Sequence, residues 1–133
     1  MKPLVDLPDA ERQLMAVLLD LGYASVSTDY PSTRLGSTAT HIQVDLESSN
    51  TDDYPVTERA QVRVVVHAAE GRRGAVKAIA AEVLADLYSF TGNADIAGIV
   101  PLSGRSAISS DPTTRNVMCW VLVRVDLLAS NAS

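Results

Sequence analysis

The feature that most constrains the fold is a long alternating segment near the end of the chain, Val117–Leu128. Its odd positions are all apolar, and its even positions mix large apolar side chains with charged ones. Twelve residues with this period predict a strand of about 40 Å with one face on a hydrophobic core. Such a strand must be paired in a sheet and covered on that face. The apolar odd positions are Val117, Cys119, Val121, Val123, Val125 and Leu127.

Two earlier segments alternate in the same way, His41–Glu47 and Glu58–Ala68. Each is predicted to be a strand with one face on the core. Shorter strands are predicted over Ala24–Thr28 and Ser103–Ser109, and residues 91–98 are predicted to form a turn region. The inward positions of the two alternating strands are Ile42, Val44, Leu46, Ala60, Val62, Val64 and Val66.

Helical periodicity is found over Pro8–Leu21 and Arg72–Ser89. Pro8 suits a first helical turn, and Gly22 is typical of the residue that ends a helix. The second helix would be about 27 Å long, enough to lie along a sheet. The apolar stripes contain Leu7, Leu14, Val17, Leu18 and Leu21 in the first helix, and Val76, Ile79, Ala80, Val83, Leu84 and Leu87 in the second.

The predicted order α-β-β-β-α-β-β favours an α+β fold, with a single mixed, mainly antiparallel sheet of about five strands packed by two helices. At 133 residues the chain is expected to form one domain, residues 1–133. Residues 29–40 are rich in Ser, Thr, Gly and Pro and form a long loop or hairpin arm, either a plain connection or a partner-contacting segment. Residues 129–133 are a polar tail that is expected to fray.

Composition argues against nucleic-acid binding as the main role. The net charge is −5 and only 5% of residues are aromatic, so the chain offers neither a basic surface nor many rings for stacking on bases. Residues 1–57 carry −6, from three basic and nine acidic side chains, whereas residues 58–133 carry +1. This asymmetry is either chance or a means for unlike surfaces of neighbouring copies to meet. No signal peptide and no apolar run of membrane-spanning length is present, so no membrane contact is expected.

Reactive side chains are few, which predicts that the protein is not an enzyme and holds no cofactor. His41 and His67 fall on the polar faces of neighbouring strands, where they are either a metal-binding pair or, as we expect, surface or interface histidines. Cys119, on an apolar strand face, is predicted to be a buried structural thiol. Gly71–Gly74 could bind an anion at a helix start but lacks P-loop spacing, so a charged, flexible helix start is the favoured interpretation.

The second face of the two longest strands combines apolar and basic side chains. Trp, Met and Arg are enriched where proteins contact one another, so this face predicts a subunit interface. The alternative is that the helix Pro8–Leu21 covers it, making the sheet a buried middle layer. The interface candidates are Arg63, Val65, His67, Met118, Trp120, Leu122 and Arg124.

Several segments resemble tail terminator proteins of long-tailed phages that infect actinobacteria. Gly71–Ala78 (GRRGAVKA) and Leu84–Tyr88 (LADLY) resemble the central helix of that family. Its opening segment is similar to residues 4–12 (LVDLPDAER), and its closing strands are similar to residues 98–106 (GIVPLSGRS) and 111–125 (DPTTRNVMCWVLVRV). The resemblance covers most of the chain, and its motifs are structural and not chemical.

The resemblance implies a virion protein that forms a ring, usually of six copies, at the tail–neck junction. The ring caps the head-proximal end of the tail tube, stops tube growth and meets the head-completion, or stopper, protein. Assembly takes place in the host cytoplasm, and genome DNA later passes through the ring without sequence-specific binding. An acidic lumen would let DNA slide, and Glu47, Asp52 and Asp53 are the candidates to line it.

Three other readings remain open at the level of sequence. Another head–tail connector or stopper would also be a small ring subunit. A small ligand-binding or regulatory α+β domain would be a monomer or dimer with a polar-lined pocket. An enzyme would need His41, His67 or Cys119 to converge on a cleft.

Overall fold

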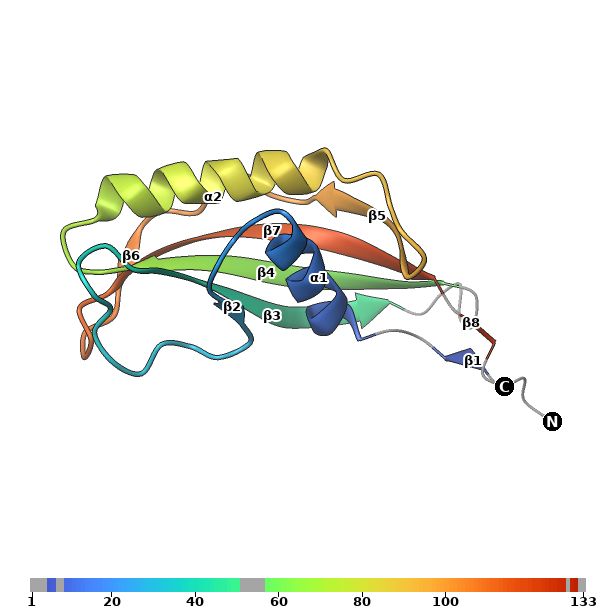
Figure 1. The fold of residues 1–133 in the computed structure, drawn as a ribbon, viewed down its shortest axis with the longest axis horizontal. Helices are drawn as coiled ribbons and strands as arrows, with labels where there is room; N and C mark the ends of the chain where they lie inside the picture. The colour runs from blue at the N-terminus through green and yellow to red at the C-terminus, as the bar shows by residue number, and fades with distance from the viewer. Residues whose placement is uncertain (1–4, 7–8, 51–56, 129, 132–133) are drawn as a thin grey trace.

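The strand predicted over Val117–Leu128 forms the middle of a six-stranded sheet and is labelled β7 (Figure 1). The computed structural model describes residues 5–6, 9–50, 57–128 and 130–131. Along its whole length β7 pairs antiparallel with β4, Thr57–Ala68, so that Val62 lies opposite Val123 and Val66 opposite Cys119. This register puts the apolar alternate residues of both strands on the same face, as period-two patterning requires.

The remaining strands extend this pair on both sides, in the order β2-β3-β4-β7-β5. β3, Thr40–Asn50, pairs antiparallel with β4, and β2, Val26–Ser27, pairs parallel with β3. On the other edge, β5, Ile96–Pro101, and β6, Ser109–Ser110, pair antiparallel with β7. The predicted mixed, mainly antiparallel sheet is confirmed. A separate two-stranded pair joins β1, Val5–Asp6, to β8, Ser130–Asn131.

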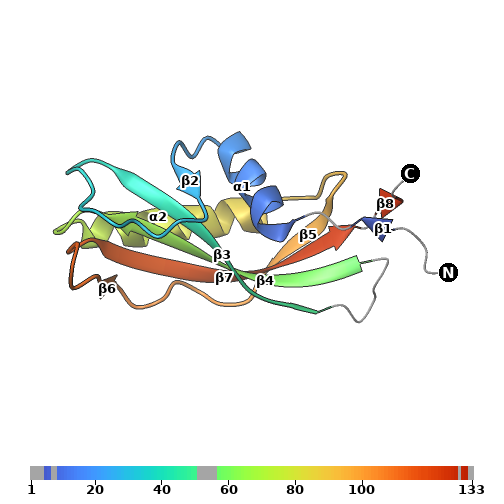
Figure 2. The ribbon, with the colours of Figure 1, turned by 90° about the horizontal axis from the view of Figure 1, so that it is seen from below.

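Both helices lie on the same face of the sheet. α1, Ala10–Asp20, begins at Asp9, whose carboxylate accepts hydrogen bonds from the backbone N–H groups of Glu11 and Arg12. α2, Arg73–Tyr88, runs along the strands, while α1 lies beside β2 and β3 (Figures 1 and 2). Neither helix of the described ranges has the length and apolar character needed to cross a membrane.

One hydrophobic core fills the space between the helices and the sheet. It takes most of the predicted apolar positions of both helices and most of the inward positions of the three long strands. Burial of an apolar side chain of this size contributes about 1.5–3 kcal/mol to the free energy of folding. The fully buried members with the largest side chains are Leu14, Leu18, Leu87, Ile96 and Leu127.

The structure corrects several details of the prediction. A strand over Ser103–Ser109 is wrong, since the chain forms β5 earlier, in a segment expected to be a turn, and only the two-residue β6 later. Leu21 follows α1 and is 44% exposed, so it is not a core residue. Leu46 is 43% exposed because the β3–β4 register shifts just beyond it. Leu7 and Pro8 lie outside the described residues.

Candidate subunit interface

Neither helix of the described residues lies on the second face of the sheet. We call it the open face, and define it by the side chains of Arg63, Val65, His67, Met118, Trp120, Leu122 and Arg124. α1 and α2 both contribute to the core on the opposite face. The alternative in which the helix Pro8–Leu21 covers the second face is therefore wrong. Helices on one side of the sheet leave its other face without helical cover.

The long loop that precedes β3 covers one end of the open face. The Tyr30 ring meets the His67 ring edge-on, with the ring centroids 5.1 Å apart. Its hydroxyl donates to a carboxylate oxygen of Asp111 at 2.7 Å, and a weaker contact of 4.0 Å reaches the Met118 sulfur. Burial and the Asp111 carboxylate raise the pKa of Tyr30 to about 12, and the Tyr30 hydroxyl together with backbone N–H groups lowers the pKa of Asp111 to about 2.

Asn116 holds the same loop from the start of β7. Its side-chain NH2 donates to the carbonyl of Thr33 at 2.9 Å, and its side-chain oxygen accepts from the backbone N–H of Leu35 at 2.9 Å. Asn116 is buried, so these two bonds satisfy polar atoms that water cannot reach. The loop predicted over residues 29–40 is thus fixed on its own chain, beside β6 at one end of the sheet (Figure 1).

His67 lies beneath this loop and is 1% exposed. Its Nε2 lies 3.0 Å from the side-chain oxygen of Gln43 and donates to it in the neutral ring. Its Nδ1 has no hydrogen-bond partner among the described residues. Burial, with a smaller effect of His41, lowers the pKa of His67 to about 4. A surface position for His67 was the wrong prediction, and a neighbouring copy cannot reach it while the loop stays in place.

His41 lies directly opposite His67 across the β3–β4 pair, with the ring centroids 6.3 Å apart. Both ring nitrogens of His41 are engaged by serine hydroxyls, Nδ1 by Ser25 at 2.8 Å and Nε2 by Ser27 at 2.9 Å. Within the described ranges no group of three or more His, Cys, Asp or Glu side chains is placed to hold a metal ion. The metal-binding alternative therefore gains no support from the geometry of the two rings.

The middle of the open face is a stacked pair, Arg63 and Trp120. The Arg63 guanidinium lies 5.2 Å from the centre of the Trp120 ring and also forms an ion pair with Glu47. Together with Met118 and Val65, this pair lines a hollow of about 140 Å³. Arg63, Met118 and Trp120 are each partly exposed, so the hollow can receive a side chain from another molecule.

The far end of the open face carries Leu122 and Arg124. Arg124 makes two hydrogen bonds to the Asp126 carboxylate, of 2.8 and 3.1 Å, so its charge is balanced within the strand. Leu122 is partly exposed between this ion pair and Trp120. Of the seven predicted interface residues, five remain accessible to a partner: Arg63, Met118, Trp120, Leu122 and Arg124.

Of the three acidic residues predicted to line the lumen, Glu47 alone lies among the described residues. Glu47 lies on β3 and is paired with Arg63, which offsets its charge locally. Asp52 and Asp53 lie outside the described residues.

Cys119 and the Gly71–Gly74 segment have structural roles. The Cys119 thiol is fully buried and donates to the carbonyl of Ser106 at 3.4 Å, as predicted for a structural cysteine. Gly71 adopts a φ of +87°, which a residue with a side chain rarely takes, and α2 begins two residues later. Arg72 donates to the carbonyl of Ala39, which ties the start of α2 to the long loop.

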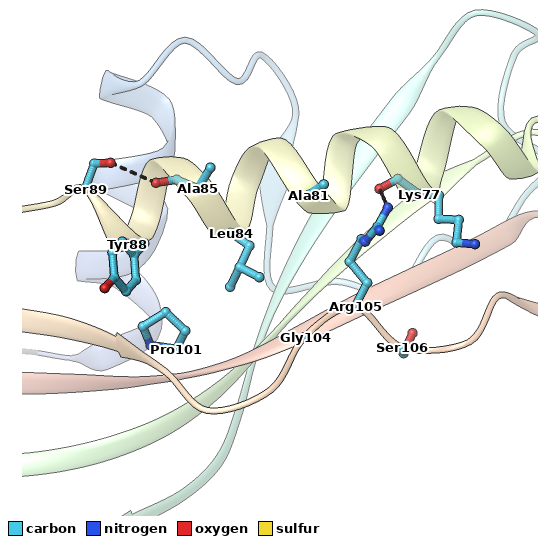
Figure 3. A pocket seen from close by; sticks show the side chains of 10 residues that line it. All are labelled: Lys77, Ala81, Leu84, Ala85, Tyr88, Ser89, Pro101, Gly104, Arg105 and Ser106. Carbon is cyan, nitrogen blue, oxygen red and sulfur yellow. Dashed lines mark hydrogen bonds between the residues drawn. The ribbon is translucent and has the colours of Figure 1, made fainter.

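Sequence reasoning missed a groove of about 700 Å³ between α2 and the segment that follows β5 (Figure 3). Leu84, Tyr88 and Pro101 lie toward one end, and the side chains of Lys77 and Arg105 lie toward the other. Tyr88 is 73% exposed, and a tyrosine on the outer side of a helix was the one signal that could have indicated a surface of interest.

No protein-family model matches the sequence, and no curated protein matches it either.

Proposed function

We propose that this protein is a structural subunit that forms a ring of about six copies and caps the head-proximal end of a phage tail tube. In this role it ends polymerisation of the tube and meets the stopper protein at the tail–neck junction of the virion, after assembly in the host cytoplasm. Genome DNA passes through the ring without sequence-specific contacts. The resemblance of residues 4–12, 71–78, 84–88, 98–106 and 111–125 to tail terminators supports this role. The observation that carries the proposal is the open face.

The accessible part of the open face has the composition of a protein–protein contact. Trp120, Met118 and Arg63 are of the types enriched in interface centres, and they lie side by side on neighbouring strands. Stacking of Arg63 on Trp120 fixes both side chains before a partner arrives, which lowers the entropy cost of association. A neighbouring copy is the expected occupant because a ring repeats one contact around its circumference.

The candidate catalytic groups do not converge. Cys119 points into the core and His67 lies on the opposite face of the sheet, beneath Tyr30. Both nitrogens of His41 are hydrogen-bonded to serines. A structural role is favoured over an enzymatic one, since a nucleophile and its base must lie within hydrogen-bond reach beside an open cleft.

Another neck ring protein, such as a connector or stopper, would use the same open face and is the nearest alternative. A small ligand-binding domain is favoured by a different observation, the groove along α2, whose volume is in the range of small-molecule sites. Neck ring proteins assemble into rings, whereas a ligand-binding domain is expected to be a monomer or dimer. The mass of the protein in solution therefore separates these two classes.

The test is light scattering over a range of concentrations, with negative-stain images. Wild-type protein is expected to form closed rings of about six copies, alone or after addition of a phage tail-tube protein. Trp120→Ala should lower the assembled mass while the urea midpoint of the single copy changes little, because Trp120 is only partly buried within one chain. Leu19→Ala, an exposed apolar residue on α1, is the matched control and should assemble normally.

Two results would contradict the proposal. The first is a single copy at every concentration that also fails to bind tube ends. The second is loss of folding in Trp120→Ala, which would place Trp120 in the core of the single chain. Leu122→Glu is the second variant, because it adds a charge to the open face without removing the tryptophan.

A further inference from the structure

We propose that the groove along α2 binds a short extended peptide segment of a partner protein, with carboxylates at one end of the segment and apolar side chains at the other. The groove lies between α2 and the chain that follows β5 (Figure 3). It is a site separate from the open face. It goes beyond the proposed function, because every residue that lines it comes from a single copy.

One end of the groove carries two positive charges without a local anion. The Arg105 guanidinium donates to the backbone carbonyl of Lys77 at 3.2 Å, so both basic side chains lie at this end (Figure 3). None of the described residues that line the groove is an aspartate or a glutamate. Among the described residues neither Lys77 nor Arg105 has an ion-pair partner within 4.0 Å. The two charges repel one another, and a carboxylate of a ligand would relieve that repulsion.

The other end of the groove is apolar. Tyr88 is 73% exposed, the largest value among the exposed large hydrophobic residues that the structure describes. Leu84 and Pro101 line the groove beside it (Figure 3). A tyrosine ring offers a large contact area and loses little conformational entropy when it is covered. The ligand therefore needs apolar side chains at this end, in addition to carboxylates at the basic end.

Between its two ends the groove is lined by small residues. Ala81 and Ala85 lie on its α2 side, and Gly104 lies on the opposite side. A Cβ added at Gly104 would meet nothing within 4 Å, so the backbone there is open to a ligand. The hydroxyls of Ser89 and Ser106 already donate to carbonyls of their own chain. The middle of the groove can therefore accept a peptide backbone without selecting particular side chains.

The dimensions of the groove favour an extended peptide over a helix. From Lys77 to Tyr88, α2 rises by about 16 Å. A groove of about 700 Å³ along this length has a mean cross-section of about 40 Å². An extended chain occupies about 50 Å², given strand spacings of roughly 4.8 Å and sheet spacings of roughly 10 Å. An α-helix about 10 Å in diameter occupies about 80 Å². An extended segment of about five residues therefore matches both the length and the width of the groove.

Two synthetic peptides are the probes, Asp-Asp-Gly-Leu-Leu and its reverse, each acetylated and amidated at its ends. Both orders are needed because the groove leaves the chain direction of the ligand open. An NMR titration of the ¹⁵N-labelled protein measures the affinity and the location of binding together. One peptide is expected to bind at a single site per copy, more weakly as the salt concentration rises. Replacing both aspartates with asparagine, or both leucines with serine, should weaken binding by about tenfold or more.

Variants of the protein locate the two ends of the site. Lys77→Ala with Arg105→Ala should weaken binding of the acidic peptide by about tenfold. The matched control, Arg12→Ala with Arg34→Ala, removes the same charge outside the groove and should bind as the wild type does. Tyr88→Ala should also weaken binding, whereas Tyr88→Phe keeps the ring and should bind normally. All five side chains are exposed, so thermal melts of these variants should match the wild type.

Any of four results would overturn the inference. They are no binding of either peptide, equal binding of the acidic and asparagine peptides, equal binding by the groove variant and its control, and chemical-shift changes confined to the open face. A lower assembled mass of Tyr88→Ala without peptide would assign the groove to a second copy, which would overturn the choice of a different protein as partner. Ring formation is measured separately by light scattering, so the inference and the proposed function can fail independently.

Discussion

Acidification is expected to destabilise the fold through one side chain, His67. The ring is 1% exposed, and its unprotonated Nδ1 finds no hydrogen-bond partner in the part of the chain that the structure describes. A proton added there would create a buried cation whose new N–H group has no acceptor, with His41 nearby. This is why the pKa of His67 falls from 6.5 in the unfolded chain to about 4 in the fold.

The sign and size of the effect follow from proton linkage. Between pH 6.5 and about 4 the unfolded chain binds a proton at His67 that the folded chain does not bind. The free energy of unfolding is therefore highest above pH 6.5 and falls as the pH drops toward 4. A shift of this size corresponds to about 3 kcal/mol, a large share of the roughly 5–15 kcal/mol that stabilises a typical domain.

The assay is urea unfolding at several pH values between 7 and 4, followed by the fluorescence of Trp120, the only tryptophan in the sequence. His67→Gln removes the titrating ring and should flatten the pH dependence, even if it lowers stability at pH 7. His41→Gln keeps His67 and should retain most of the slope. A wild-type protein with constant stability across this range, or an equal slope in His67→Gln, would refute the reasoning.

Three further predictions concern the core, the turns and the loop. Leu18→Ala should lower the free energy of unfolding by about 2–5 kcal/mol because Leu18 is fully buried, whereas Leu19→Ala, at 49% exposure, should change it by less than about 0.5 kcal/mol in the same urea titration. Gly92→Ala should lower the melting temperature, because Gly92 has a φ of +109° and an added Cβ would lie 2.9 Å from the carbonyl oxygen of Ala97. Gly74→Ala is the contrasting variant in α2. An added Cβ there meets open space, so the free energy of unfolding should rise by about 0.5–1 kcal/mol. Tyr30→Phe removes the hydroxyl that donates to Asp111, so the pKa of Asp111 should rise from about 2 toward 3.8. An NMR titration of the Asp111 carboxyl would measure this shift. An unchanged pKa would show that backbone N–H groups alone keep the pKa of Asp111 low.

The sheet was largely predictable because period-two patterning is strong in its central strands. The bounds of β7 and of α2 follow closely from the positions of their apolar residues. β5 was missed because Gly92, Asn93 and Gly98 indicate a turn in a sequence, although an edge strand tolerates a glycine such as Gly98. Gly98 lies at a register shift against β7, where the ladder is already irregular.

The open face was predictable from the same alternation, since the outward positions of β4 and β7 follow once the inward ones are known. The loop that covers one end of this face was not predictable, because a loop has no periodicity that would place Tyr30 over His67. The groove along α2 depends on where the chain runs after β5, which local patterns do not encode.

The pairing of β4 with β7 has a consequence for how the protein is made. Its partners are 71 residues apart in the chain at one end, Thr57 with Leu128, and 49 apart at the other, Ala68 with Val117. The hairpin of β3 and β4 can form while synthesis continues. The full β4–β7 ladder must wait until residue 128 has left the ribosome. Closing so long a loop is slow, so the valine-rich β4 spends that interval unpaired on its β7 side. Nascent chains are therefore expected to need chaperone protection until β7 has emerged.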